Sequence, residues 1–295
     1  MSPGSARVEA TGAVRGALRF ARYALAPNRL GYCGPSDTGA LFEQAVELGR
    51  SQPSSRFPGR EPMGWPRSAS SVADLTGGLR TIAQGFEGAW PYLELIAGAN
   101  HIRDPLDDAV VAAYWLGGPL LERVGAHAAG LHVQQRFASR AGRWWSEVSA
   151  ALEPGVAPGH AFHVMVVGPW VGMMRSGHTD TPLSVMDRCR IRRARVLEVH
   201  GCEALVSTDR IAFRSGVLFV DGGQTGGVIE RVLLGEGGVH PCGDVQPGDI
   251  VTVHWDWVCE VVDSATSRCL AAAELAALGS ANRALASAGT VDLGG

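Results

Sequence analysis

The spacing of apolar residues changes about two thirds of the way along the chain. Before residue 154, apolar positions recur every three or four residues, which is the period of an amphipathic helix. Helices are predicted at 18–26, 38–48, 72–86, 89–102 and 105–117, with a helical stretch interrupted by glycines at 119–152. Pro27 is expected to end the first helix, and residues 51–69, which contain four prolines, are expected to form a loop.

From about residue 187 the pattern becomes that of short strands. Runs rich in β-branched residues are separated by the turn signals His200-Gly201, Ser215-Gly216 and Asp221-Gly222. Several short strands within about 80 residues predict a small closed barrel of the OB-like kind, and residues 267–286 predict a last helix. The predicted fold class is therefore α+β: a mainly α-helical N-terminal domain, then an OB-like β-barrel and a C-terminal helix.

These patterns divide the chain into five segments, with the proline- and glycine-rich stretch 154–158 as the main boundary. They are a flexible tail at 1–18, a helical domain at 19–153, a bridging segment at 154–186, the barrel with its C-terminal helix at 187–285, and a flexible tail at 286–295.

Composition and charge exclude several classes of protein. A hydrophobic fraction of 46% and a charged fraction of 19% are typical of a folded chain, and a net charge of −3 gives no reason to expect nucleic acid or an anionic membrane as partner. No apolar run approaches the roughly 20 residues of a membrane span, and the amino terminus lacks the apolar core of a secretory signal, so a cytoplasmic location is expected. In that reducing compartment the six cysteines, which include no C-x-x-C pair, are expected to be free thiols or ligands.

Polar residues with possible chemistry gather in the loop after the first helix and in the bridging segment. Cys33 is flanked by glycines, where backbone approaches a ligand closely, and His160 and His163 have the spacing of one helical turn. The plain alternative for Cys33 is a free thiol without a ligand. For His160 and His163 it is a polar bridging segment with exposed histidines. The candidate ligand-binding residues are Asn28, Arg29, Cys33, Asp37, His101, His160 and His163.

Two stretches of the predicted barrel are similar, in the same order, to the HypC/HupF family of hydrogenase maturation chaperones. The stretch from Cys189 to Gly201 (CRIRRARVLEVHG) resembles the opening strand of that family, and 247–258 (PGDIVTVHWDWV) resembles a later strand, histidine included. In the family the cysteine and the histidine are implicated in holding iron, with its cyanide and carbonyl ligands, on the way to the [NiFe] hydrogenase large subunit. The resemblance implies this role for Cys189 and His254.

The chemistry of such an iron favours a thiolate and tolerates an imidazole. The neighbouring Arg188, Arg190, Arg192 and Arg193 are expected to lower the pKa of Cys189. The plain alternative is a buried thiol and a hydrogen-bonded barrel histidine. The segments YALAPNRLGYCGPSD and HAFHVMVVGPWVGMMR also make the whole chain resemble an uncharacterised, mainly actinobacterial family.

Three functions remain open. The first, favoured over an enzyme, is an accessory or scaffold protein in [NiFe] hydrogenase maturation that binds or relays an iron centre, or docks maturation proteins or the hydrogenase large subunit. The second is an enzyme that binds a small molecule in the helical domain around Cys33, Arg29 and His101, with the barrel as docking module. The third is an interaction protein without chemistry, which requires Cys189 and His254 to point apart or to be buried without access.

Overall fold

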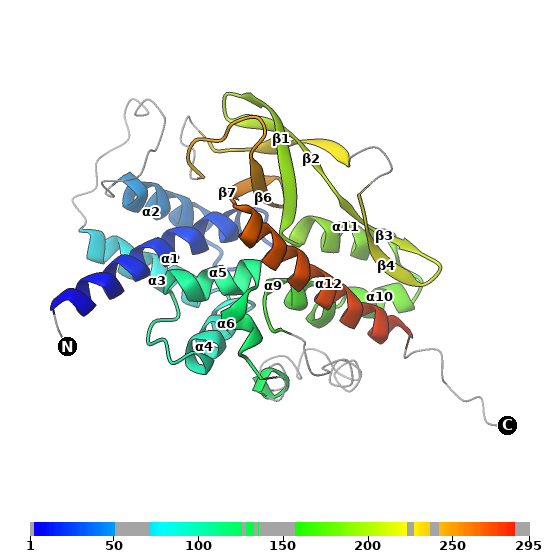
Figure 1. Cartoon of the computed structure of the whole chain (residues 1–295), viewed down its shortest axis with the longest axis horizontal. Helices are drawn as coiled ribbons and strands as arrows, with labels where there is room; N and C mark the ends of the chain where they lie inside the picture. Colours follow the sequence, from blue (N-terminus) through cyan, green and yellow to red (C-terminus); the bar gives the residue numbers. More distant parts are fainter. Residues whose placement is uncertain are drawn as a thin grey trace.

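The computed structural model describes residues 3–50, 71–125, 128–132, 135, 157–222, 227–236 and 242–286. A helical region is followed by a closed five-stranded barrel and a long C-terminal helix (Figure 1). The α+β class and the order of its parts are therefore confirmed.

The helices before residue 125 follow the predicted apolar pattern. They are α1 Pro3–Arg29, α2 Thr38–Arg50, α3 Val72–Gln84, α4 Trp90–Ala99, α5 Asp108–Leu116 and α6 Pro119–Glu122. Ser71 and Asp74 form a capping box at the start of α3. Helix α5 begins three residues later than predicted, because the Asp107 side chain accepts the Ala109 N–H and caps it there. The predicted loop at 51–69 and most of the glycine-rich stretch after residue 125 lie outside the described residues.

The prediction of a flexible tail at 1–18 differs from the structure, in which α1 extends back to Pro3 and buries Ala17 and Leu18. Small residues make this packing close: a Cβ atom added to Gly16 would lie 1.8 Å from the Leu106 carbonyl oxygen. Pro27 lies inside the last turn of α1 and does not end it. Contact through small residues gives little hydrophobic signal, and for that reason the sequence did not reveal it.

The segment predicted as a bridge, 154–186, instead contributes to the main core. It forms α9 His160–Phe162, the π-helix η1 His163–Val167, α10 Trp170–Arg175 and α11 Asp180–Cys189. Phe162, Met165 and Val171 are buried in the same cluster as the side chains of α1, α4 and α5. Helix α11 continues to Cys189. The family resemblance had suggested that Cys189 opens a strand, but in the structure this cysteine ends a helix.

The barrel closes in the order β1-β2-β5-β7-β6, with β5 and β7 parallel and the other pairs antiparallel. Its strands are β1 Arg192–His200, β2 Glu203–Thr208, β5 Val228–Leu233, β6 Ile250–His254 and β7 Trp257–Val261. A separate hairpin, β3 Arg210–Arg214 and β4 Val217–Asp221, is inserted between β2 and β5. Alternate side chains such as Val196, Val206 and Val251 fill the barrel interior.

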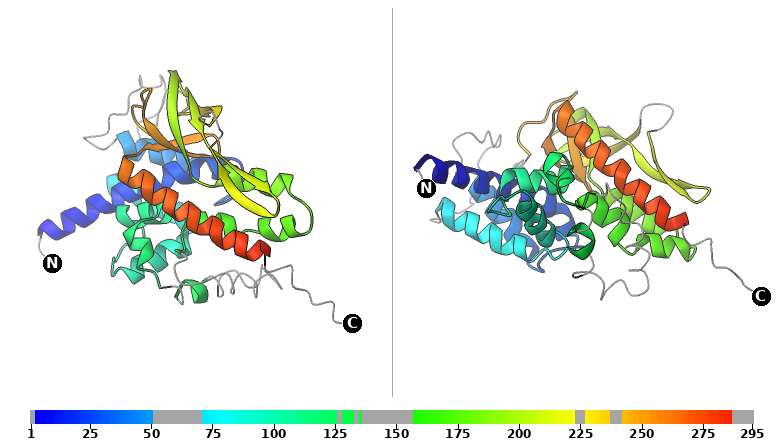
Figure 2. Two further views of the ribbon diagram at one scale, coloured as in Figure 1. Left: turned by 45° about the vertical axis from the view of Figure 1, so that its right-hand side comes forward. Right: turned by 60° about the horizontal axis from the view of Figure 1, so that its bottom comes forward.

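Helix α12, Ser264–Ala286, leaves the barrel and crosses the helical region (Figures 1 and 2). It packs on α5, α9, η1 and α10, and buries Leu270, Leu278 and Ala281 in the main core. The tail predicted at 286–295 lies almost wholly outside the described residues. Among the described helices, none has the length and apolar character that crossing a membrane requires.

Candidate metal centre

The register between β1 and β6 brings His254 to Cys189. Arg192 at the start of β1 pairs with Val253, so His254 comes next, beyond the end of the ladder. The Trp255 N–H then donates to the carbonyl oxygen of Arg188, 2.8 Å away, which ties the end of β6 to the end of α11. Two residues 65 positions apart in the sequence thus meet where the barrel joins the helical region.

His160, the first residue of α9, completes a group of three. One donor atom from each of His160, Cys189 and His254 lies within 4.8 Å of the other two. No other group of three or more His, Cys, Asp or Glu residues comes together in this way in the described part of the chain. Donor atoms bound to one metal ion are about 3.3–4 Å apart, given metal–ligand bonds of 2.0–2.3 Å, so small side-chain rotations would close this group on an ion.

Hydrogen bonds hold both imidazoles with one ring nitrogen available. His254 Nδ1 lies 2.6 Å from the carbonyl oxygen of Tyr23, which assigns the proton to Nδ1. His254 Nε2 is buried and has no hydrogen-bond partner. In His160, Nε2 lies 2.8 Å from the carbonyl oxygen of Cys189, which leaves the lone pair on Nδ1. A carbonyl acceptor on the second ring nitrogen is the usual way in which proteins orient a metal-binding histidine.

Burial keeps all three groups neutral in the metal-free protein. It lowers the pKa of His254 to about 4, and burial together with the neighbouring His254 lowers the pKa of His160 well below its usual value. Burial raises the pKa of the Cys189 thiol to about 12; Cys33 also raises it, whereas the otherwise unpartnered Trp255 indole N–H lowers it. Neutral imidazoles are ready to bind a metal, and the thiol must release a proton.

The expectation that arginines lower the pKa of Cys189 is wrong. Arg190 donates to Asp187, Asp209 and Glu274, and Arg192 donates to Glu230 and to the Trp255 carbonyl oxygen. Arg188 lies over the Trp255 ring, 5.0 Å from its centroid. Arg193 pairs with Asp209. Burial has the largest effect on the pKa of Cys189 and raises it.

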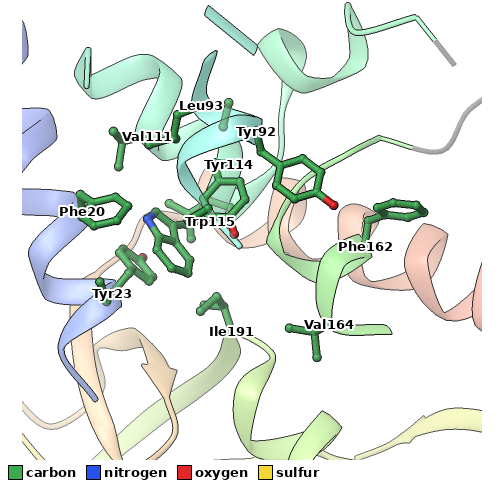
Figure 3. Close-up of a cluster of buried hydrophobic side chains, with 14 of the residues drawn as sticks. Phe20, Tyr23, Tyr92, Leu93, Val111, Tyr114, Trp115, Phe162, Val164 and Ile191 are labelled. Atoms are coloured by element: carbon green, nitrogen blue, oxygen red, sulfur yellow. The ribbon is translucent and has the colours of Figure 1, made fainter. Parts of the chain in front are cut away.

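Aromatic side chains enclose the centre. The Trp115 ring lies 4.6 Å from the His160 ring and 5.7 Å from the His254 ring, centroid to centroid. Trp115 itself lies between Tyr23 and Tyr114 (Figure 3), with ring centroids 5.3 and 4.8 Å away. Trp255, directly after His254, has φ of +57°, an uncommon backbone conformation for a large side chain.

The donor set fits a transition metal. Two imidazole nitrogens and one sulfur, without a carboxylate, favour borderline or soft ions such as iron(II), zinc or copper over magnesium or calcium. Three protein ligands leave a coordination position for an exogenous ligand. The orphaned, buried Nε2 of His254 is what such a site would leave in the metal-free protein.

The other residues singled out in the sequence are dispersed. Asp37 caps the start of α2, Arg29 pairs with Glu236, and His101 is exposed in a turn with φ of +56°. Asn28 is buried, and its amide donates to the carbonyl oxygens of Cys33 and Pro35, so it shapes the loop that carries Cys33.

Cys33 and His163 line one pocket with a volume of about 930 Å³. Its walls come from the loop after α1, the turn before α4, η1 and α10. Of the three residues expected to surround a small molecule in the helical region, only Cys33 lines this pocket.

Sequence reasoning grouped His160 with His163, whereas the structure directs His160 to Cys189 and His254, and His163 to the pocket. It missed Trp115 and Trp255. Trp255 had a signal, since it directly follows the motif histidine. Trp115 had none, because its place beside the centre depends on how α5 packs.

Comparison with known proteins gives one match. A family model described as "Family of unknown function (DUF6390)" matches residues 12–288, which is almost the whole chain. No curated protein and no solved structure matches the chain.

Proposed function

We propose a function for this chain, which belongs to the DUF6390 family of unknown function: it is an accessory protein that binds and relays a transition-metal centre at His160, Cys189 and His254. The observation that carries the proposal is the meeting of these three side chains in a buried place, with His254 Nε2 left without a partner. A buried polar atom costs free energy unless it is paired, so a ligand that pairs it would be held firmly.

We propose iron as the metal, because the resemblance to the HypC/HupF family implies iron with cyanide and carbonyl ligands for the equivalents of Cys189 and His254. His160 has no counterpart among the motif residues of that resemblance and would add a third ligand. The chain itself supplies a thiol that becomes a thiolate on binding the metal, two oriented imidazoles and an aromatic enclosure that limits the access of water. The iron is the cargo, destined for a [NiFe] hydrogenase large subunit in the cytoplasm.

The test is isolation of the tagged protein from its own host without oxygen. We expect about one iron per chain, infrared bands of cyanide and carbonyl ligands, and co-purification of hydrogenase maturation proteins. Cys189→Ala should lose the iron and the bands, while Cys202→Ser, which removes a thiol outside the centre, should keep both. Zinc or copper in place of iron would refute the hydrogenase assignment, and a metal content unaffected by Cys189→Ala would refute the centre.

A further inference from the structure

A pocket beside the proposed metal centre has donor groups of its own. Cys33, His163, Met173 and His178 supply a thiol, two imidazoles and a thioether, and Glu87 is the one carboxylate among the described residues of the wall. No lysine or arginine lines it in the part of the chain that the structure describes. Such a wall suits a soft or borderline metal cation, and its described residues offer an anionic ligand no lysine or arginine.

The Tyr114 hydroxyl group links the pocket wall to the centre on one side. Gly88 lines the pocket, and its carbonyl oxygen accepts the Tyr114 hydroxyl at 3.0 Å. The same hydroxyl oxygen lies 3.5 Å from His160 Nδ1, the nitrogen that carries the lone pair. Tyr114 therefore contacts the pocket wall and the centre through the same hydroxyl group.

A second contact links the pocket to the other side of the centre. Tyr32, on the pocket wall, stacks on Trp255 with ring centroids 4.2 Å apart. Trp255 directly follows His254, and its indole N–H influences the thiol of Cys189. Tyr32 is exposed and Trp255 is buried, so this stacked pair extends from the protein surface to the residue beside His254.

Cys33 has a fixed position at this pocket. The buried Asn28 amide holds the carbonyl oxygens of Cys33 and Pro35 at 3.1 and 2.9 Å. Gly34, with φ of +86°, packs so closely on Phe86 that an added Cβ would lie 2.4 Å from the ring. The loop is thus clamped on both sides of the cysteine, and the thiol is presented to the pocket, where it is accessible.

We propose that this pocket is the port through which the metal ion reaches the buried centre, with Cys33 as the thiolate that holds the ion first. The inference rests on the proposed function. The ion passes from Cys33 to Cys189 by ligand exchange: the metal–sulfur bond at Cys33 breaks and one at Cys189 forms. Burial raises the pKa of Cys33 to about 12, so this thiol releases its proton to solvent when it binds the ion. In the exchange the Cys189 proton passes to Cys33, so uptake of the ion releases one proton overall and no oxidant or reductant takes part.

The test follows the loading of Co²⁺ into metal-free protein by stopped-flow absorption without oxygen, using the sulfur-to-cobalt charge-transfer band. Two variants probe the port. Cys33→Ser removes the first ligand, and Gly172→Phe narrows the pocket from α10, where an added Cβ meets no atom within 4 Å. Their matched controls are Cys202→Ser, another thiol, and Gly77→Phe, an equally open helical glycine on α3.

We expect both port variants to reach the wild-type final spectrum with one Co²⁺ per chain, but at least tenfold more slowly, and both controls to load at the wild-type rate. Wild-type loading rates in Cys33→Ser and Gly172→Phe would overturn the port and leave the centre intact. Slow loading in Gly172→Phe alone would keep the route and overturn the role of Cys33. No band in the wild type, or a band that survives Cys189→Ser, would overturn the proposed function and the port with it.

Discussion

Two buried polar clusters meet at adjacent residues of this protein and differ in character. Arg190, with 1% of its surface exposed, donates to Asp187, Asp209 and Glu274, so its charge is fully paired. Cys189, one residue earlier, lies in a neutral group in which His254 Nε2 has no partner. Paired charges fix one arrangement of the chain, whereas a buried hydrogen-bond acceptor without a partner lowers stability until a ligand binds it. We interpret the first cluster as structural, and we propose that the second binds a metal ion.

The largest effect should come from breaking the structural cluster. Arg190→Met leaves three neighbouring carboxylates without their buried cation, and we expect the free energy of unfolding to fall by about 3–5 kcal/mol. For a chain of this size that lowers the Tm by roughly 10 °C. Thermal unfolding measures it, and Co²⁺ titration of the folded variant should give the wild-type Kd. A stable Arg190→Met protein would contradict the structural role.

The opposite outcome is expected from breaking the metal centre. Cys189→Ala or His254→Ala should weaken Co²⁺ binding at least 100-fold, which is about 2.7 kcal/mol, because each removes one of three ligands. The metal-free Cys189→Ala protein should unfold within a few degrees of the wild type, whereas His254→Ala also removes the hydrogen bond to the Tyr23 carbonyl oxygen and should be less stable. Cys259→Ala is the matched control, since Cys259 is a fully buried thiol in β7 outside the group. It should lose some stability and keep its Kd.

Lowering the pH should affect the two clusters differently, because the buried histidine of the second cluster changes its protonation on unfolding. In the unfolded chain a histidine has a pKa of about 6.5, whereas burial lowers the pKa of His254 to about 4 in the folded protein. Because the unfolded chain binds the proton first, stability falls as pH drops from about 6.5 toward 4, by roughly 2 kcal/mol at pH 5 for this one ring. Burial lowers the pKa of His163 in the same direction.

The Arg190 guanidinium keeps its charge throughout this range, because its carboxylate partners raise its pKa against the opposing effect of burial. Urea unfolding of metal-free protein at pH 7 and pH 5 measures the difference. His254→Asn should reduce the loss of stability on acidification, and His200→Asn, which changes an exposed histidine, should not. An equal loss in all three proteins would contradict the neutral state assigned to His254.

The smallest effect is expected at Tyr114, which contacts the centre without belonging to it. Tyr114→Phe removes the hydroxyl that lies 3.5 Å from His160 Nδ1, and we expect the Kd for Co²⁺ to change less than tenfold. A 100-fold loss would place this hydroxyl among the ligands. Isothermal titration calorimetry at constant pH distinguishes the two.

The sequence predicted the parts of the molecule that rest on regular patterns. Apolar periodicity predicted most helices before residue 125 and the barrel after residue 187, because each period reflects one buried face. The motif register paired Cys189 with His254, although the cysteine ends a helix and does not lie in a strand. Cys189 and His254 still lie close together, because the pairing of β1 with β6 ends at Arg192 and Val253, just before His254.

Tertiary packing decided the rest. The packing of α1 against 106–107 depends on Gly12 and Gly16, which carry no apolar signal. His160 and His163 were grouped by helical spacing, but the chain passes into a π-helix at His163, and the two rings serve different sites. The enclosure by Trp115 depends on how α5 meets the barrel, which no local pattern encodes.

The most direct test of the centre is X-ray absorption spectroscopy of the protein loaded with one equivalent of Zn²⁺. We predict one sulfur ligand at about 2.3 Å and two imidazole nitrogens at about 2.0–2.1 Å, with the sulfur lost in Cys189→Ala and one imidazole lost in His160→Ala. A first shell of nitrogen and oxygen alone in the wild type, or a sulfur that persists in Cys189→Ala, would contradict a centre built from His160, Cys189 and His254.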